Sequence, residues 1–226
     1  MTAEQASGQR KDNWSLVSKA YAHILDGIVS GRYEPDSSLR LQALASEIGV
    51  SMIPVREALR RLEAEHLVRI TQNRGAQVAP LSLEDVQDAY SVRIILEVEA
   101  LRRSFAAITD EDLARAREHI ERMVKLWERG DEAGFEAHRE LHFILYEKVN
   151  SQWMIRTIET LWSHTERYRR LATELRGDPR AIGSEHSAVI DAVERGDEET
   201  ALTTLRAHLE RSVAVITESP VFGETT

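Results

Sequence analysis

The chain has 226 residues, and its composition of 42% hydrophobic and 30% charged residues is that of a globular protein with one large domain or two ordinary ones. It has no cysteine, which excludes a disulfide framework, a thiolate metal site and a cysteine nucleophile. No apolar run approaches the roughly 20 residues of a membrane span, and "MTAEQASGQRKDNW" lacks the apolar core of a signal peptide. We therefore expect a cytoplasmic protein with no membrane partner.

The net charge of -9 is distributed unevenly along the chain. Residues 1–80 hold 10 Lys+Arg and 9 Asp+Glu, whereas residues 81–226 hold 19 and 29. This contrast predicts two domains with different partners, one over residues 1–80 and one over residues 81–226. The acidic second part does not exclude DNA binding, provided that basic residues gather on one face of the first part.

The first third mixes short elements. Residues 14–33 have apolar side chains at helical spacing, namely Leu16, Val17, Ala20, Ile24 and Ile28. Gly31 ends this helix, "YEPDSSL" reads as a turn, and Gly49 closes a short helix in "LQALASEIGV". Ser51 is placed to cap a helix that runs to about Glu65, and two short strands follow around a turn at residues 72–75. This order of elements predicts a winged helix-turn-helix.

The rest of the chain is nearly all helical in pattern. Ser82 is expected to start a helix that runs to about Ala107, and Thr109 to cap the next one. The motif "ERGDE" occurs at residues 128–132 and 194–198, where Gly ends one helix and Asp caps another. About six helices between residues 82 and 218 predict an antiparallel bundle. The fold class is therefore mainly α, with an N-terminal winged helix-turn-helix and a C-terminal all-α antiparallel helical bundle.

The helix after Ser51 carries the residues expected to read DNA. A recognition helix presents its first turns to the bases, which here places Ser51, Met52, Ile53, Arg56 and Arg60 at the groove. Arg74, beside Gly75 at the tip of the wing, would reach a phosphate or the minor groove. The alternative is a solvated amphipathic helix in which Arg60 pairs with Glu57 or Glu63.

The segments "GRYEPDSSL", "LASEIGVS", "PVREALRRLEAEHLV" and "RGAQV" resemble the N-terminal domain of the GntR family of bacterial transcription regulators. That family usually has Arg and Thr where this chain has Met52 and Ile53, and commonly Glu and a basic residue where Leu41 and Gln42 stand. Arg can bind guanine through two hydrogen bonds, whereas Met and Ile can only touch a thymine methyl group. The resemblance therefore implies DNA binding, with Gln42 at a contact position and an operator different from that of most relatives.

Four histidines of the second part are spaced to converge. His138 and His142 lie four residues apart and share a helix face, and His186 and His208 flank the Gly196–Asp197 turn at similar distances. Imidazoles that meet inside a bundle form a ligand set for Zn, Ni or a similar divalent ion. The alternative is that each is an ordinary surface or core histidine.

Residues 82–218 resemble the all-helical FCD effector domain of the FadR branch of that family, through "HSAVIDAVERGDEETALTTLRAH". The resemblance implies a metal held by His142, His186 and His208. His138 stands where the family has an acidic ligand, and it either joins a four-histidine site or turns away and leaves the metal weak or absent. Relatives bind small organic acids in this cavity.

Other residues of this part have two readings each. Arg93 could clamp the carboxylate of an effector acid or pair with Glu97 one helical turn away. His164 could line the effector cavity or lie on a polar face. The tryptophans are expected in the core rather than against a ligand: Trp127, Trp153 and Trp162.

These features predict a non-enzymatic regulator whose operator affinity is controlled by an organic acid at or near the metal. As a homodimer it would bind a short palindrome in double-stranded DNA, and repression relieved by ligand is the commoner logic of the family. The alternative is a metal-dependent hydrolase using the His cluster, because "HRELH" partly matches the zinc-protease pattern, although Arg139 and Glu140 are in the wrong order. A third reading is a helical interaction module without DNA binding.

Overall fold

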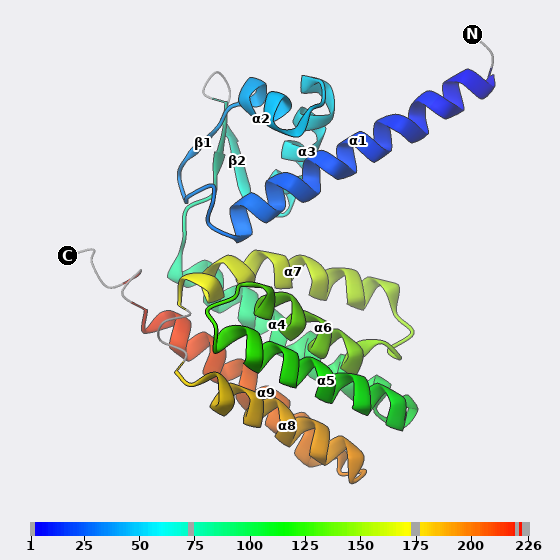
Figure 1. Cartoon of the computed structure of the whole chain (residues 1–226), viewed down its shortest axis with the longest axis vertical. Coiled ribbons are helices and arrows are strands. Elements are labelled where there is room, and N and C mark those ends of the chain that lie inside the picture. Colours follow the sequence, from blue (N-terminus) through cyan, green and yellow to red (C-terminus); the bar gives the residue numbers. More distant parts are fainter. Residues whose placement is uncertain (1–2, 72–74, 173–176, 220–221, 223–226) are drawn as a thin grey trace. The chain divides into compact units, whose positions relative to one another are not determined.

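The computed structural model describes residues 3–71, 75–172, 177–219 and 222, and residues 3–14 by their backbone alone. The chain divides into two compact units, Met1–Ser82 and Leu83–Thr226, which we call the N-terminal unit and the helical unit (Figure 1). None of the helices among these residues is long and apolar enough to cross a membrane.

The N-terminal unit consists of three helices and a small sheet, and its elements are α1 (Ala3–Val29), β1 (Ser38–Leu39), α2 (Leu41–Ile48), α3 (Met52–Ala64), β2 (Val68–Thr71) and β3 (Gly75–Val78). The strands are antiparallel in the order β1-β3-β2. This is the predicted winged helix-turn-helix, with two differences. Helix α1 starts at Ala3 because the residues before Trp14 include several good helix formers. Part of the predicted turn, Ser38–Leu39, forms a short strand because it pairs with Ala76 and Gln77 of β3.

The core of the N-terminal unit lies between α1, α2, α3 and the sheet. Ile24 of α1 and Leu59 of α3 are almost fully buried, and the same cluster includes Ile28, Leu44, Ile48, Val55, Leu62, Leu67, Val68 and Val78. Leu16, expected on the same helix face as Ile24, is instead 40% exposed. Apart from Leu16, the apolar stripes predicted from the sequence therefore hold α3 in place.

The turn between α2 and α3 is set by local geometry. Gly49 adopts a positive φ of 74°, and its N–H donates to the carbonyl of Ala45. Glycine adopts this left-handed conformation at little energetic cost because it has no side chain. Ser51 occupies the N-cap position of α3 as predicted, but its side chain makes no capping hydrogen bond. The usual donor for such a bond is the third helical residue, which here is Pro54 and has no N–H.

The helical unit has six α-helices among its described residues, as the spacing of the turns predicts. They are α4 (Leu83–Ser104), α5 (Asp110–Trp127), α6 (Ala133–Tyr146), α7 (Gln152–Leu171), α8 (Pro179–Glu194) and α9 (Glu198–Thr217), with a short 3-10 helix at Phe105–Ala107. Helix α4 packs against α6, α7 and α9, while α5 and α6, and α8 and α9, form adjacent pairs (Figure 1). Side chains of α4, α6, α7, α8 and α9 therefore share one interior.

The turns and caps of this unit follow the predicted chemistry, except that Glu132 and not Asp131 occupies the N-cap position of α6, where Asp131 accepts from the N–H of Ala133. Gly130 and Gly196 both adopt a φ of 70°. Asp197 caps α9 by accepting a hydrogen bond from the N–H of Thr200. Thr109 and Asp112 form a reciprocal capping box at the start of α5, in which each side chain accepts from the other residue's backbone N–H. These contacts hold the pKa of the Asp112 carboxyl below its usual range.

We expect Thr109→Ala to lower the free energy of unfolding of the helical unit by about 1 kcal/mol, because the N–H of Asp112 loses its capping acceptor. Calorimetry of the full chain should register this as a fall of about 2–4 °C in the Tm of that unit. Thr160→Ala is the matched control, since the Thr160 hydroxyl is exposed and bonds only the carbonyl of Arg156 in the preceding turn. Equal Tm values for the two variants would show that the capping box contributes nothing.

Candidate functional site

The outer face of α3 is exposed where the sequence predicts DNA reading. The inner face of α3 consists of buried residues: Val55, Ala58, Leu59 and Leu62. The opposite face exposes the five residues predicted to lie at the groove, Ser51, Met52, Ile53, Arg56 and Arg60. Met52 is 49% and Ile53 63% exposed, high values for large apolar side chains. Packing within the N-terminal unit does not explain why these two positions hold large apolar residues. Their exposed side chains are free to contact another molecule.

The arginines of α3 differ in their surroundings. Arg60 pairs with Glu57 at 3.3 Å, as the amphipathic alternative expected. Arg61 pairs with Glu65 and stacks over the Tyr21 ring, so it links α3 to α1. Within the part of the chain that the structure describes, no carboxylate pairs with Arg56.

The remaining predicted DNA contacts lie outside α3. Gln42 is exposed on α2, and Gly75 is exposed at the start of β3 with a φ of 85°. Arg74 lies outside the described residues. Their contact with DNA stays a prediction.

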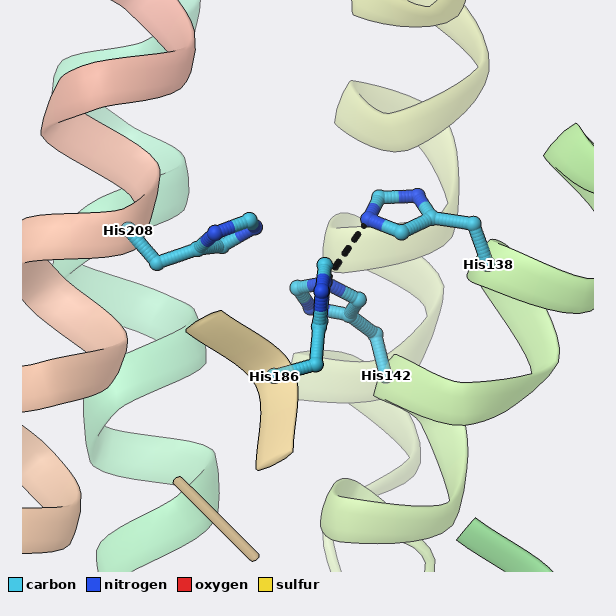
Figure 2. A group of neighbouring side chains, drawn as sticks. All are labelled: His138, His142, His186 and His208. Atoms are coloured by element: carbon cyan, nitrogen blue, oxygen red, sulfur yellow. Dashed lines mark hydrogen bonds between the residues drawn. The ribbon is translucent and has the colours of Figure 1, made fainter. Parts of the chain in front are cut away.

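The four predicted metal-binding histidines converge in the interior of the helical unit (Figure 2). One ring nitrogen from each lies within 4.8 Å of those of the others, and all four residues are buried. His138 and His142 come from α6, His186 from α8 and His208 from α9. The Nε2 atoms of His138, His142 and His186 are 3.0 to 3.2 Å apart, and the rings of His186 and His208 have centroids 4.3 Å apart.

Three of these imidazoles are oriented by hydrogen-bond acceptors on their Nδ1 side. His186 Nδ1 lies 2.8 Å from the carbonyl oxygen of Ile182. His208 Nδ1 lies 2.9 Å from Glu185 Oε2, and Glu185 also pairs with Arg211. His142 Nδ1 lies 3.3 Å from the Tyr146 hydroxyl. An acceptor on Nδ1 keeps the proton there, so each ring offers Nε2 as a metal ligand.

The chemistry of this donor set suits a divalent transition metal. Burial lowers the pKa of His142 to about 4, although Glu97 opposes that shift, so the ring is neutral at pH 7. The Nε2 atoms of His142 and His186 therefore turn lone pairs toward each other at 3.0 Å. Nitrogens that share one zinc ion at about 2.0–2.1 Å lie roughly 3 Å apart, so a metal would relieve this contact.

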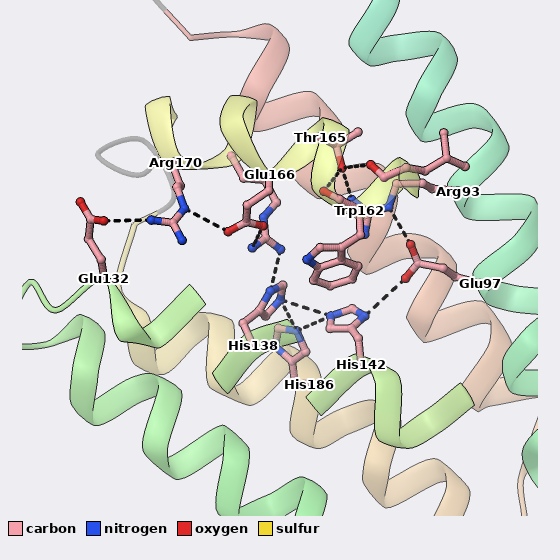
Figure 3. Close-up of polar contacts among 12 residues, drawn as sticks. Arg93, Glu97, Glu132, His138, His142, Trp162, Thr165, Glu166, Arg170 and His186 are labelled. Carbon is pink, nitrogen blue, oxygen red and sulfur yellow. Dashed lines mark hydrogen bonds and ion pairs between the residues drawn. The ribbon is translucent and has the colours of Figure 1, made fainter. Parts of the chain in front are cut away.

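A buried ion pair lies beside His142 (Figure 3). Arg93 Nε donates to Glu97 Oε1 at 2.7 Å, and Arg93 also donates to the Thr165 hydroxyl at 2.6 Å. Glu97 Oε2 accepts from Tyr146 at 2.8 Å and lies 3.5 Å from His142 Nδ1. Burial disfavours ionisation of Glu97, but Arg93 and His142 hold its pKa at about 2. Of the two readings of Arg93, the pairing with Glu97 is present, and contact with an effector stays a prediction.

Helix α7 contributes residues that the sequence analysis missed. Arg169 is buried, its Nη1 lies 2.6 Å from His138 Nδ1, and it pairs with Glu166. Two guanidinium groups lie over the Trp162 ring, with Arg93 4.4 Å and Arg169 5.1 Å from the ring centroid. The basic run "ERYRR" was the available signal, but an arginine-rich helix normally indicates a solvent-facing surface.

His164 and the tryptophans occupy different environments from one another. His164 is buried, with its Nε2 2.7 Å from Asp85 Oδ2, and its role toward an effector stays a prediction. Trp162 is 2% exposed and Trp127 packs edge-on against Phe135, as expected of core residues. The prediction for Trp153 is wrong, because this side chain is 80% exposed at the start of α7.

Two family models match the two units. The model described as "Bacterial regulatory proteins, gntR family" matches residues 16–78, and the FCD domain model matches residues 88–211. The chain belongs to the GntR family of regulators with an FCD domain. Regulators of this family bind DNA through the helix-turn-helix, FCD domains bind effectors, and some of them bind metals.

Individual relatives agree with this assignment. The HTH-type transcriptional regulator BphR of Paraburkholderia xenovorans is 35% identical over 89% of this chain and 85% of its own. The HTH-type transcriptional repressor GlaR of Escherichia coli is 25% identical over 88% and 94%. The solved structure of E. coli McbR/YncC covers 89% of this chain and 96% of its own at a TM-score of 0.79, and at 22% identity it shows the shared fold.

The family assignment does not support the hydrolase alternative, because its members are transcriptional regulators and not enzymes. The positions of the side chains explain why the pattern "HRELH" is a misleading sign of a hydrolase. Glu140, the only candidate base in that pattern, pairs with His119 at 3.1 Å and Arg122 at 3.4 Å on the exposed side of α6. His138 and His142 point to the opposite, buried side.

Removing the partner of a buried charge should destabilise this GntR-family regulator strongly. We expect Arg93→Met to lower the free energy of unfolding of the helical unit by about 3–5 kcal/mol, because the Glu97 carboxylate stays buried without its cation. The double variant Arg93→Met/Glu97→Gln removes the stranded charge and should recover part of the loss. Thermal unfolding of the full chain measures both variants. A double variant as unstable as the single one would show that charge imbalance is not the cause.

Proposed function

We propose that this GntR-family regulator is a repressor that binds a short DNA palindrome as a homodimer and releases it when a small organic acid binds. The acid would bind at or near a Zn or Ni ion held by the His cluster of the helical unit. The observation that carries this proposal is the convergence of four buried histidine nitrogens within 4.8 Å inside an FCD domain.

The proposed DNA contact rests on the exposed face of α3. Its arginines, Arg56 and Arg60, are solvated and can reach phosphates or guanine edges, whereas Met52 and Ile53 can pack on thymine methyl groups. Gln42, Ser51, Arg74 and Gly75 complete the proposed contact set. A C2 dimer places two such helices on a two-fold symmetric site, which is the reason for proposing a palindrome.

The proposed effector chemistry rests on the charges around the cluster. Each nearby carboxylate already has an arginine partner: Glu97 has Arg93, Glu166 has Arg169 and Glu185 has Arg211. Among the described residues these carboxylates are thus committed to arginines, and a dication held by imidazoles would need a further anion to balance its charge. An organic acid supplies the missing negative charge, and the metal supplies the positive charge that binds it.

We base the proposed sign of regulation, which is repression, on two relatives. GlaR and RspR of E. coli are both named transcriptional repressors, and they are 25% and 24% identical to this chain. Effector binding would change operator affinity through a coupling free energy on the order of 1–3 kcal/mol. Arg93 and His164 are the proposed effector contacts, since both are buried side chains of the FCD domain that can bind an acid.

Metal content is the first test. Protein purified without a histidine tag or chelator should carry about one Zn or Ni ion per chain by elemental analysis, because three or four neutral nitrogens surround one position. His186→Ala should lose it, whereas His119→Ala should keep it, since His119 lies outside the cluster beside Glu140. Wild-type protein that stays metal-free after incubation with Zn and Ni would refute the metal site.

DNA reading can be tested with the duplex that the wild-type protein selects from a randomised library. We expect that duplex to be a palindrome, and Arg56→Ala to bind it roughly 10- to 100-fold more weakly, since a good base contact contributes about 1–3 kcal/mol. Arg102→Ala is the control, an exposed arginine of α4 that pairs with Glu99. If both variants bind equally well, Arg56 does not contact the operator.

A further inference from the structure

The hydrogen bond between Arg169 and His138 determines which nitrogen of His138 carries its proton. Arg169 NH1 lies 2.6 Å from His138 Nδ1, and a guanidinium group can only donate. His138 Nδ1 must therefore accept, and in a neutral imidazole the proton then resides on Nε2. His138 Nε2 is the atom that faces the cluster, 3.0 Å from His186 Nε2 and 3.2 Å from His142 Nε2.

The neighbouring rings of His186 and His142 carry their proton on Nδ1 instead of Nε2. His186 Nδ1 faces the carbonyl of Ile182, which can only accept, so His186 Nε2 is an acceptor. His142 Nδ1 faces the oxygen of Tyr146, whose own proton goes to Glu97, so His142 Nε2 is an acceptor too. The three hydrogen bonds from Arg169 through His138 and His186 to Ile182 thus run in one direction.

We propose that His138 is not a metal ligand but an N–H donor, positioned by Arg169, to an anion bound on a metal that only His142, His186 and His208 hold. This inference rests on the proposed metal site. It assigns His138 and Arg169 to recognition of the effector acid.

The metal and the proton of His138 compete for the same acceptor. His186 Nε2 cannot accept a hydrogen bond from His138 and coordinate a metal through the same lone pair. When the metal binds, the N–H of His138 must find another acceptor close to the metal. The oxygen of a metal-bound carboxylate meets this need, and a charge-assisted hydrogen bond of that kind is stronger than a neutral one.

The surroundings of Arg169 prevent the alternative in which His138 turns its lone pair to the metal. Arg169 is 2% exposed, its NH2 group lies 2.6 Å from Glu166 Oε2, and its guanidinium lies over Trp162 and Phe135. Ligation through Nε2 of His138 would require either an imidazolate or the loss of the Arg169 hydrogen bond. Loss of that bond gives up a charge-assisted hydrogen bond between two buried groups, which is costly.

The tautomers can be observed directly in the zinc-loaded protein with 15N-labelled histidine. Long-range proton–nitrogen NMR spectra should report, among the four rings of the cluster, one protonated on Nε2 and three protonated on Nδ1, and His138→Gln should remove the first. The buried ring of His164, whose Nε2 faces Asp85, gives a separate Nε2-protonated signal that His164→Gln identifies. A His138 signal with Nδ1 protonated and Nε2 on the metal would overturn the proposal. In Arg169→Met the constraint is gone, and the Nε2-protonated signal should weaken or vanish.

Metal affinity separates a donor from a ligand. In His138→Gln the amide N–H replaces the Nε2–H but offers no nitrogen lone pair, and His142→Gln makes the same change at a proposed ligand. Loss of an outer-shell group costs about 10- to 100-fold in metal affinity. Because His138→Gln keeps the N–H, we expect its zinc dissociation constant to rise by less than about 10-fold, and that of His142→Gln, which loses a ligand nitrogen, to rise at least about 100-fold. Equal losses in the two variants would make His138 a ligand.

Anion binding gives the third readout, with acetate as the probe and Co²⁺ as the metal, whose visible absorption reports its ligands. His138→Leu removes the donor and should weaken acetate binding roughly 10- to 100-fold, whereas His138→Gln should keep it within about threefold. Acetate affinity in His138→Leu equal to wild type would overturn the donor role. Wild-type protein that binds none of the metals would instead refute the proposed metal site itself, so the two failures are distinguishable.

Discussion

Every charged side chain that the helical unit buries needs a partner inside the protein, because burial of a charge without one is costly. Arg93 and Arg169 meet this requirement with Glu97 and Glu166, and both guanidinium groups lie over the Trp162 ring. The pairing commits the nearby carboxylates to arginines. What the same interior offers to a metal is therefore a set of neutral imidazoles, which is the physical basis of the proposed preference for an anionic effector.

In the N-terminal unit, one face of α3 packs against the core and the opposite face is exposed for the proposed DNA contact. Val55, Leu59 and Leu62 hold α3 against the rest of the unit, while Met52 and Ile53 are exposed at its first turn. Residues on the outer face contribute little to the core, so the family's usual Arg and Thr can be replaced there without cost to the fold. The same separation lets regulators with one fold acquire different operators.

Much of the fold was predictable because its signals are local. The turn at Gly49, the two "ERGDE" turns and the Thr109 capping box depend on residues a few positions apart, and their structures follow the prediction. Ser51 was predicted to cap α3 through its side chain, and it fails to do so because Pro54 lacks the N–H that it would bind. Trp153 was assigned to the core from its residue type alone, and type does not exclude exposure.

The convergence of the histidines was also within reach of the sequence. A spacing of four residues puts His138 and His142 on one face of a helix, and a tight turn brings His186 and His208 level across a helical hairpin. The side chains that hydrogen-bond to these histidines could not be predicted from the sequence, because their identity depends on which faces of helices far apart in the chain meet. Arg169 lies 31 residues after His138, and no periodicity indicates that the two touch.

The sequence by itself thus determined most of the elements, their order, the family and the four histidines, since helix periodicity and turn chemistry are properties of short segments. It did not determine β1, which forms only because it pairs with β3. Only the tertiary structure decided the partner of each buried group: Glu97 for Arg93, Glu185 for His208 and Arg169 for His138. The reason is that a hydrogen bond between helices depends on their packing, which the whole core sets together. On those partners depend the proton position of His138 and, with it, the proposed way in which the protein recognises an acid.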